Sequence, residues 1–112
     1  IRETKADLDQ CEMPTPLLGH VGDGNFHVCF IMDRDAPEQV EEAERLHRRM
    51  VERALAMGGT CTGEHGIGMG KRDLLAEEAG GGVDVMARIK HALDPGNIFN
   101  PGKIFRPDDI VR

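Results

Sequence analysis

Two apolar runs, residues 16–22 and 25–32, flank an Asp-Gly pair at residues 23–24. This arrangement is the strongest short-range signal of a β-hairpin, because a two-residue Asp-Gly turn matches the twist of the flanking strands. With such a loop the register pairs His20 with His27, and directly paired residues have Cβ atoms about 4.5–5.5 Å apart. The sequence therefore predicts two imidazoles side by side on one face of the hairpin.

Helical periodicity dominates the remainder of the chain. Apolar residues recur at three- and four-residue steps, which is typical of helices with one buried face. Glycines or prolines stand where the predicted helices end. A hairpin combined with helices indicates the α+β class. The expected elements are a helix end at 1–10, the hairpin, a helix at about 37–57, a short strand at 60–62, helices at 71–79 and 83–93, and a turn-rich tail at 97–105 that lies extended on a surface.

The charge balance of the 112 residues excludes several classes of protein. The formal net charge is −6, which argues against nucleic-acid binding because that needs basic patches. No apolar run approaches the ~20 residues needed to span a bilayer, and the charged N-terminal residues do not resemble a signal peptide. Three irregularly spaced cysteines do not look like a disulfide framework, so we expect a reducing compartment. These features predict a cytoplasmic protein, or one peripheral to a membrane, with no nucleic-acid partner.

A glycine-rich loop at residues 62–68 supplies a carboxylate and a third imidazole. Its glycines permit backbone conformations that other residues avoid, so Glu64 and His65 can point in directions that a strand would not allow. Two histidines and one carboxylate suit Zn²⁺ or a similar divalent metal and leave a coordination position open for catalysis. The predicted metal ligands are His20, His27 and Glu64.

His65 is the predicted general base beside this metal, because histidine ordinarily titrates near neutrality. The simpler interpretations are a flexible loop with solvated charges and a cross-strand histidine pair that is only polar surface. A dinucleotide-binding fingerprint is rejected because residues 66–70 follow no long strand and have the wrong spacing. A phosphate-binding loop is rejected because Lys71 is followed by Arg72.

Three motifs, in this order, resemble a known family. They are GHVGDGNFH at 19–27, TGEHGIGMGK at 62–71 and LDPGNIFNPGKIF at 93–105. Together they are similar to the C-terminal domain of FAD-linked oxidases, which include D-lactate dehydrogenases, the flavin subunit of glycolate oxidase and D-2-hydroxyglutarate dehydrogenases. The resemblance implies that residues 1–112 form part of a ferredoxin-like substrate domain and that a separate N-terminal domain holds most of the FAD. A chain that begins without Met fits a processed or truncated piece of such a protein.

The resemblance also assigns roles to individual residues. His20 and His27 match metal-binding histidines, and Glu64 matches the third metal ligand in the members that use a divalent metal such as Zn or Mn. His65 matches the residue that takes the proton of the substrate hydroxyl. Asn100 matches a residue close to the flavin.

These matches imply an FAD-dependent dehydrogenase that oxidises a small D-2-hydroxyacid, with D-lactate and glycolate first among the candidates, and passes a hydride to the flavin. The implied partners are the upstream FAD-binding domain and an electron acceptor such as a cytochrome, a quinone or a flavoprotein. Cys29 stands where some metal-using members carry Asn, which weakens the transfer of 2-hydroxyglutarate specificity. Without its flavin domain, the isolated chain is expected to be inactive.

The residues alone leave two other classes open. One is a metal-dependent hydrolase that uses the same three ligands, with His65 as its base. The other is a metal-binding or interaction module without catalysis. An FAD-binding domain encoded upstream in the same reading frame separates the dehydrogenase from both.

Overall fold

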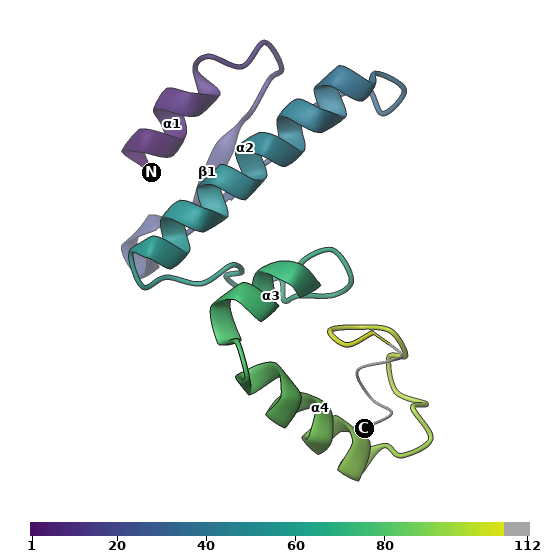
Figure 1. Cartoon of the computed structure of the whole chain (residues 1–112). Helices are drawn as coiled ribbons and strands as arrows, with labels where there is room; N and C mark the ends of the chain where they lie inside the picture. The colour runs from purple at the N-terminus through teal and green to yellow at the C-terminus, as the bar shows by residue number, and fades with distance from the viewer. Residues whose placement is uncertain (107–112) are drawn as a thin grey trace. The chain divides into compact units, whose positions relative to one another are not determined.

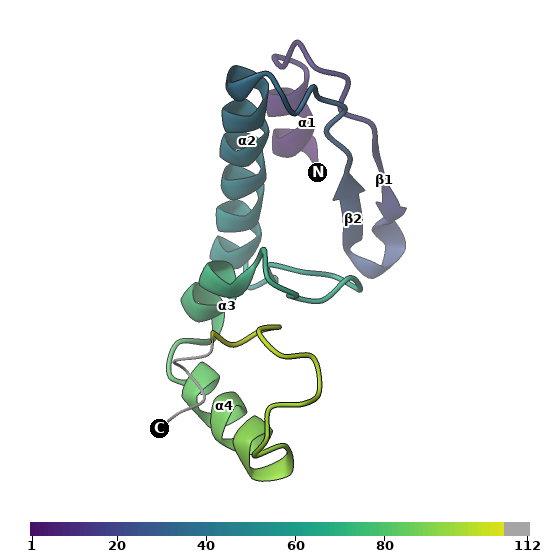
Figure 2. The same ribbon diagram turned by 90° about the vertical axis from the view of Figure 1, so that its right-hand side faces the viewer.

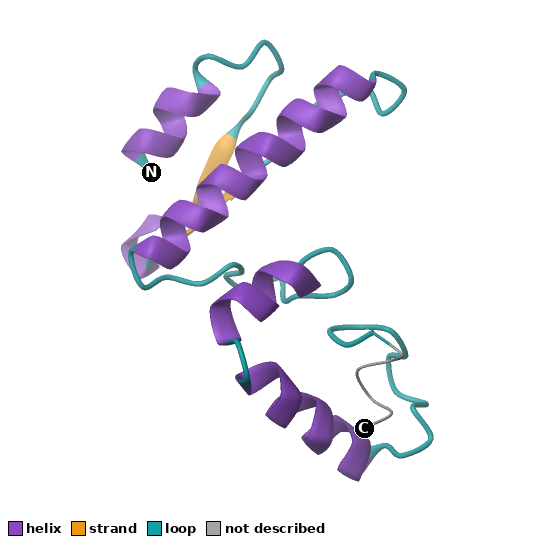
Figure 3. Ribbon diagram, in the orientation of Figure 1, coloured by secondary structure: helices purple, strands orange, loops and turns teal. Residues whose placement is uncertain are grey.

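The chain divides into two compact units, Ile1–Gly59 and Thr60–Arg112, and each is described by itself. The structure is a computed structural model that describes residues 1–106 (Figure 1). The described residues contain four α-helices and one two-stranded antiparallel sheet, which confirms the predicted α+β class (Figure 3). The predicted domain also includes residues 107–112, which lie outside the described residues. None of the helices within residues 1–106 is both long and apolar enough to cross a membrane.

Helices α1 (Arg2–Leu8) and α2 (Pro37–Ala56) pack together in the first unit. Asp7 Oδ2 lies 2.8 Å from Arg53 Nη2 and 2.9 Å from Arg49 Nε, so two guanidinium groups tie α1 to α2. The hydrogen bond from Arg53 holds the pKa of Asp7 below its usual value. Figure 2 shows α1 and the hairpin on the same side of α2. The buried side chains of the two helices are Thr4, Leu8, Ala43, Leu46 and Val51.

Helix α2 begins and ends as the sequence predicts. Pro37 stands at its first position, where a missing N–H costs nothing. At the other end, Gly58 N–H donates to the Leu55 carbonyl at 3.0 Å and Gly59 N–H donates to the Ala54 carbonyl at 2.8 Å. Gly58 has φ +75°, which completes a Schellman C-cap. The prediction that the glycine pair closes this helix is confirmed.

The hairpin forms where it was predicted, but its strands are shorter and its loop is longer. β1 (Leu17–His20) runs antiparallel to β2 (Asn25–Val28). The connection contains a 3₁₀ turn at Val21–Asp23 instead of a two-residue loop. The predicted direct pairing of His20 with His27 is therefore wrong. Val21 and Gly22, which were expected to end the first strand, belong to the turn instead.

The observed register still places both imidazoles on one face. His20 faces Asn25, and Leu18 faces His27. The difference from the predicted register is two residues along the ladder, and side chains alternate between faces with a period of two. His20 and His27 are therefore diagonal neighbours, at a spacing of about 7–8 Å typical of such positions, rather than directly paired.

Helices α3 (Arg72–Ala79) and α4 (Gly82–Leu93) form the second unit, close to the predicted bounds. Gly80, at φ +51°, ends α3 and separates the two helices, as expected from the glycine run. The two helices follow one another with a sharp change of direction (Figure 2).

Residues 60–62 do not form the predicted short strand. Cys61 N–H donates to Glu78 Oε2 at 2.8 Å, and the Thr60 hydroxyl donates to the Thr62 carbonyl. The polar groups of this segment are therefore satisfied by a side chain of α3 and by a local turn. The β-prone composition is outweighed because no neighbouring strand in the described residues pairs with it.

The tail at 97–105 is turn-rich, as predicted, but it is not extended on a surface. Ile104 N–H donates to the Gly68 carbonyl at 2.7 Å, and Phe105 is only 6% exposed, in a cluster with Ala87 and Val83 of α4. The tail therefore folds back into the second unit. Its positive φ angles lie at Asn97, Asn100, Gly102 and Ile104.

We predict that Gly19→Ala disrupts the hairpin whereas Gly22→Ala is tolerated. Gly19 has φ +150°, and a Cβ atom there would lie 2.4 Å from Phe26 Cα, while a Cβ atom on Gly22 would meet nothing within 4 Å. Such overpacking typically costs about 1–3 kcal/mol. Thermal unfolding of the full-length protein with amide exchange at residues 17–28 measures the difference. Equal protection in both variants would contradict the close approach of the strands.

Candidate functional site

The histidine face of the hairpin contributes the first set of predicted site residues. His20 is exposed and His27 is half-buried. Neighbouring positions on that face are exposed Leu18 and Cys29, whereas Phe26 and Val28 on the other face are partly buried. The hairpin thus presents its imidazoles on the more open of its two faces, where a ligand can reach them.

The glycine-rich loop that holds Glu64 and His65 belongs to the second unit. His65 Nε2 lies 3.7 Å from Glu64 Oε1, and the two side chains are 71% and 51% exposed. Gly66 and Gly68 have φ +74° and +55°, which confirms that the loop uses left-handed conformations open to glycine. The carboxylate and the imidazole therefore stand together at an exposed bend.

The start of this loop is anchored to α3, and a further hydrogen bond lies within the loop. At its start, Glu78 of α3 accepts from Cys61 N–H, and within the loop the Thr62 hydroxyl donates to the Gly66 carbonyl at 3.0 Å. Burial, with the hydrogen bond to Glu78 second, raises the pKa of the Cys61 thiol to about 11. Cys61 is thus a protonated packing residue at neutral pH, not a thiolate nucleophile.

Arg72, at the start of α3, joins the glycine-rich loop to the tail. Its Nε donates to the Met69 carbonyl at 3.0 Å, and its Nη1 donates to the Gly102 carbonyl at 3.4 Å. The backbone hydrogen bond from Ile104 N–H to the Gly68 carbonyl joins the same two segments. The motifs at 62–71 and 93–105 are therefore neighbours in space. No pattern in the sequence had singled out Arg72 for this role.

A buried carboxylate holds the turn that leads to Asn100. Asp94 is 7% exposed, accepts from the backbone N–H groups of Ile98 and Phe99 at 2.9 Å each, and pairs with Lys90. The hydrogen bond from Lys90, followed by that from Ile98, lowers the pKa of Asp94 to about 2. The Lys90 ammonium also donates to the Phe99 carbonyl at 2.8 Å. Asn100, with φ +48°, follows directly at the exposed end of this clamp.

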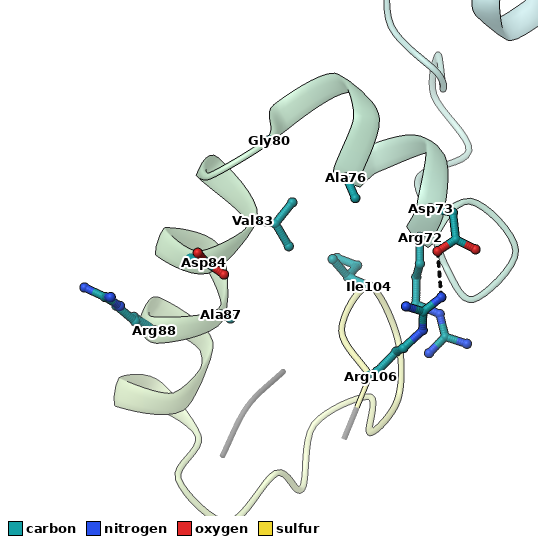
Figure 4. A pocket seen from close by; sticks show the side chains of 10 residues that line it. All are labelled: Arg72, Asp73, Ala76, Gly80, Val83, Asp84, Ala87, Arg88, Ile104 and Arg106. Carbon is teal, nitrogen blue, oxygen red and sulfur yellow. Dashed lines mark hydrogen bonds and ion pairs between the residues drawn. The ribbon is translucent and has the colours of Figure 1, made fainter. Parts of the chain in front are cut away.

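A cavity of about 600 Å³ opens in the second unit between α3, α4 and the tail. Figure 4 shows Val83 pointing into it, and the Arg106–Asp73 ion pair, at 2.6 Å, on the side of α3. None of the predicted site residues lines the cavity.

The structure thus sorts the predicted site residues into two sets. His20 and His27 lie in the first unit, while Glu64, His65 and Asn100 lie in the second. In the first unit the hairpin brings His20 and His27 to one face, and in the second unit hydrogen bonds join the motif at 62–71 to the motif at 93–105. The assembly of the two sets into a single site stays a prediction.

A sequence profile of the family described as "FAD linked oxidases, C-terminal domain" matches residues 1–104. The chain belongs to this family. The match spans both units and includes all five predicted site residues, and it confirms the resemblance noted in the three motifs.

Relatives of this chain are named as D-lactate dehydrogenases and as a glycolate oxidase subunit. The chain is 51% identical over 101 residues to the "Probable D-lactate dehydrogenase, mitochondrial" of Danio rerio, covering 89% of the chain and 20% of that protein. It is 52% identical over 101 residues to "D-lactate dehydrogenase [cytochrome] 1, mitochondrial" of Saccharomyces cerevisiae, covering 89% and 17%. Identity to "Glycolate oxidase subunit GlcD" of Bacillus subtilis is 42% over 97 residues, covering 86% and 20%. The chain therefore spans about a fifth of the length of these relatives.

We predict that Asp94→Asn loosens the turn before Asn100. The folded pKa of Asp94 lies below its ordinary value of 3.8, so its contribution to stability is complete above about pH 4 and is lost as the pH falls towards 2. Because hydrogen bonds to a charged group are lost, exchange of the Ile98 and Phe99 amides at pH 7 should accelerate about ten- to a hundredfold. Asp84→Asn, exposed on the same helix, is the control. Unchanged protection in Asp94→Asn would show that the ionised carboxylate does not hold the turn.

Proposed function

We propose that this chain is the substrate-side part of a longer FAD-dependent dehydrogenase that oxidises a small D-2-hydroxyacid, D-lactate or glycolate, to the 2-oxoacid. Family membership supports the flavin-linked oxidation. The names of the relatives, D-lactate dehydrogenase and glycolate oxidase, support the two substrates. The observation in the structure that carries the proposal is the packing of the His65 loop against the tail that bears Asn100, through Arg72 and the Ile104–Gly68 hydrogen bond.

In this proposal His65 is the general base. Its imidazole is 71% exposed on an anchored loop, so it is both accessible to a substrate and held in place. It takes the proton of the substrate hydroxyl as the α-carbon is oxidised. Glu64 beside it helps to fix the imidazole or serves as a metal ligand, and both roles need the carboxylate at this bend.

We propose that His20, His27 and Glu64 together hold a divalent metal. His20 and His27 share one face of the hairpin, and Glu64 supplies a carboxylate oxygen. Two neutral imidazoles and a carboxylate are typical ligands of a catalytic Zn²⁺ or Mn²⁺ site. When bound, the metal would polarise the substrate hydroxyl and lower its pKa. The protein residues would then orient that hydroxyl towards His65.

The turn at Asn100 fits one edge of a flavin. Ile98 and Phe99 are 76% and 70% exposed, so the turn offers apolar surface next to an amide side chain. Asn97 Oδ1 is buried without a hydrogen-bond partner among the described residues. When bound, the flavin supplies the hydride acceptor. The task of this chain is to present Asn100 in a fixed position.

The reduced flavin must pass its electrons to an acceptor, which we propose to be a cytochrome, a quinone or a partner flavoprotein. A cytochrome is favoured because the name of the Saccharomyces cerevisiae relative includes it. We also propose that the protein is cytoplasmic or peripherally associated with a membrane.

We predict that His65→Ala lowers kcat by about 10²–10⁴-fold in the full-length protein, with a smaller change in KM, because a general base acts in the transition state. Anaerobic reduction of bound FAD by D-lactate or glycolate, followed by the loss of flavin absorbance, measures the effect. His91→Ala, an exposed histidine in α4, should leave the rate unchanged. Normal turnover in His65→Ala would remove His65 from the mechanism, and full-length protein without flavin would refute the proposed function.

We predict that His20→Ala and His27→Ala each weaken divalent-metal binding in the full-length protein by on the order of tenfold or more. Loss of a group that only supports a metal ligand already costs that much, and loss of the ligand itself costs at least as much. Elemental analysis and metal titration measure the change, with His91→Ala as the control. Wild-type protein that contains no metal and binds none would refute the cluster.

A further inference from the structure

The first turn of α3 contacts both the loop that precedes it and the tail that follows α4. Arg72 Nε donates to the Met69 carbonyl at 3.0 Å, and Arg72 Nη1 donates to the Gly102 carbonyl at 3.4 Å. Asp73, the next residue, pairs with Arg106 at 2.6 Å. Figure 4 shows Arg72, Asp73 and Arg106 at the start of α3. Two consecutive residues of α3 therefore hold the tail.

The two contacts with the tail differ in their exposure to water. The side chains of Asp73 and Arg106 are 75% and 56% exposed, and exposed ion pairs contribute little to stability because water screens their charges. Arg72 is half-buried, and hydrogen bonds from a charged donor are stronger than those between neutral groups. Its bond to Gly102 is long but partly buried. We therefore expect Arg72 to hold the tail more firmly than Asp73 does.

Arg72 also binds both segments that carry predicted site residues. Met69 lies in the motif at 62–71 with His65, and Gly102 lies in the motif at 93–105 with Asn100. A guanidinium presents its donors in a rigid planar fork, so one side chain can fix the position of one segment relative to the other.

The loop of His65 depends on such contacts for its position. Gly66 and Gly68 have φ +74° and +55°, and glycines allow many other backbone conformations when contacts are lost. The His65 side chain is 71% exposed. A general base must lie within hydrogen-bond reach of the proton that it takes. A displacement of the loop would therefore move the base out of reach.

We propose that Arg72 is a positioning residue that acts through His65, by holding the loop of His65 in a fixed position relative to the turn of Asn100. This inference rests on the proposed function, in which His65 takes the proton of the substrate hydroxyl and Asn100 lies beside the flavin. In this role Arg72 contacts neither the substrate nor the flavin.

Double-mutant kinetics in the full-length protein test this role. Arg72→Ala should lower the rate constant of flavin reduction by D-lactate or glycolate about ten- to a hundredfold, with a smaller change in KM, because a misplaced base slows the chemical step. In a His65→Ala background the same substitution should change the rate less than about twofold, because the position of a missing base does not matter. Arg106→Ala, which removes the exposed contact between the tail and α3, is the matched control and should leave the rate of the otherwise wild-type protein within about twofold.

Two further measurements separate positioning from a loss of folding. Added guanidinium ion should restore part of the rate in Arg72→Ala, whereas Arg72→Lys should stay impaired because an ammonium lacks the planar fork. Arg72→Lys carries the kinetic test if Arg72→Ala does not fold. Amide exchange should accelerate about tenfold in both segments, 62–70 and 100–105, in the Arg72 variants, while exchange in α2 stays unchanged.

Three outcomes would overturn the proposal. They are a wild-type rate in both Arg72 variants, an equal loss of rate with and without His65, and a loss in Arg106→Ala as large as that in Arg72→Ala. Wild-type protein whose flavin is reduced by neither D-lactate nor glycolate would refute the proposed function instead. Amide exchange would then still test the contact, and unchanged exchange in either segment would show that Arg72 does not hold the two together.

Discussion

The hydrogen bond from Ile104 N–H to the Gly68 carbonyl is the interaction on which the second unit depends. It closes a contact between residues that are far apart in the sequence, and Arg72 reinforces it by donating to carbonyls on both sides. Ile104 has φ +65°, a conformation that costs a β-branched residue on the order of 1–3 kcal/mol. The burial of Phe105 next to it offsets this strain. Without the contact, the loop of His65 and the turn of Asn100 would be separate surface features.

The sequence predicted the elements whose cause is local. The bounds of α2 were predicted to within a residue. Its apolar spacing is a local pattern, and Pro37 and the glycine pair act within a few residues of its two ends. The hairpin was also found, but its register was wrong by two because the sequence does not show that Val21–Asp23 prefers a 3₁₀ turn. The face of His20 and His27 was nevertheless correct, because an even shift preserves side-chain alternation.

The features that the sequence missed depend on long-range contacts. The strand expected at residues 60–62 is absent because Glu78, in a later helix, takes the hydrogen bond that a neighbouring strand would have accepted. The sequence predicted the tail to lie on a surface because its turn residues do not indicate which residues Ile104 and Phe105 contact. In the sequence, Arg72 served only as the residue after Lys71 that rules out a phosphate-binding loop. Its part in joining two motifs follows from the geometry of Met69 and Gly102, which no local pattern contains.

Each of the two units is small for a domain with a core of its own. Units of about fifty residues bury a smaller fraction of their surface than larger domains, and no large side chain within residues 1–106 is less than 2% exposed. The small cluster of Val83, Ala87 and Phe105 therefore holds one side of α4, whereas Val85, Ile89 and Leu93 on another side are exposed.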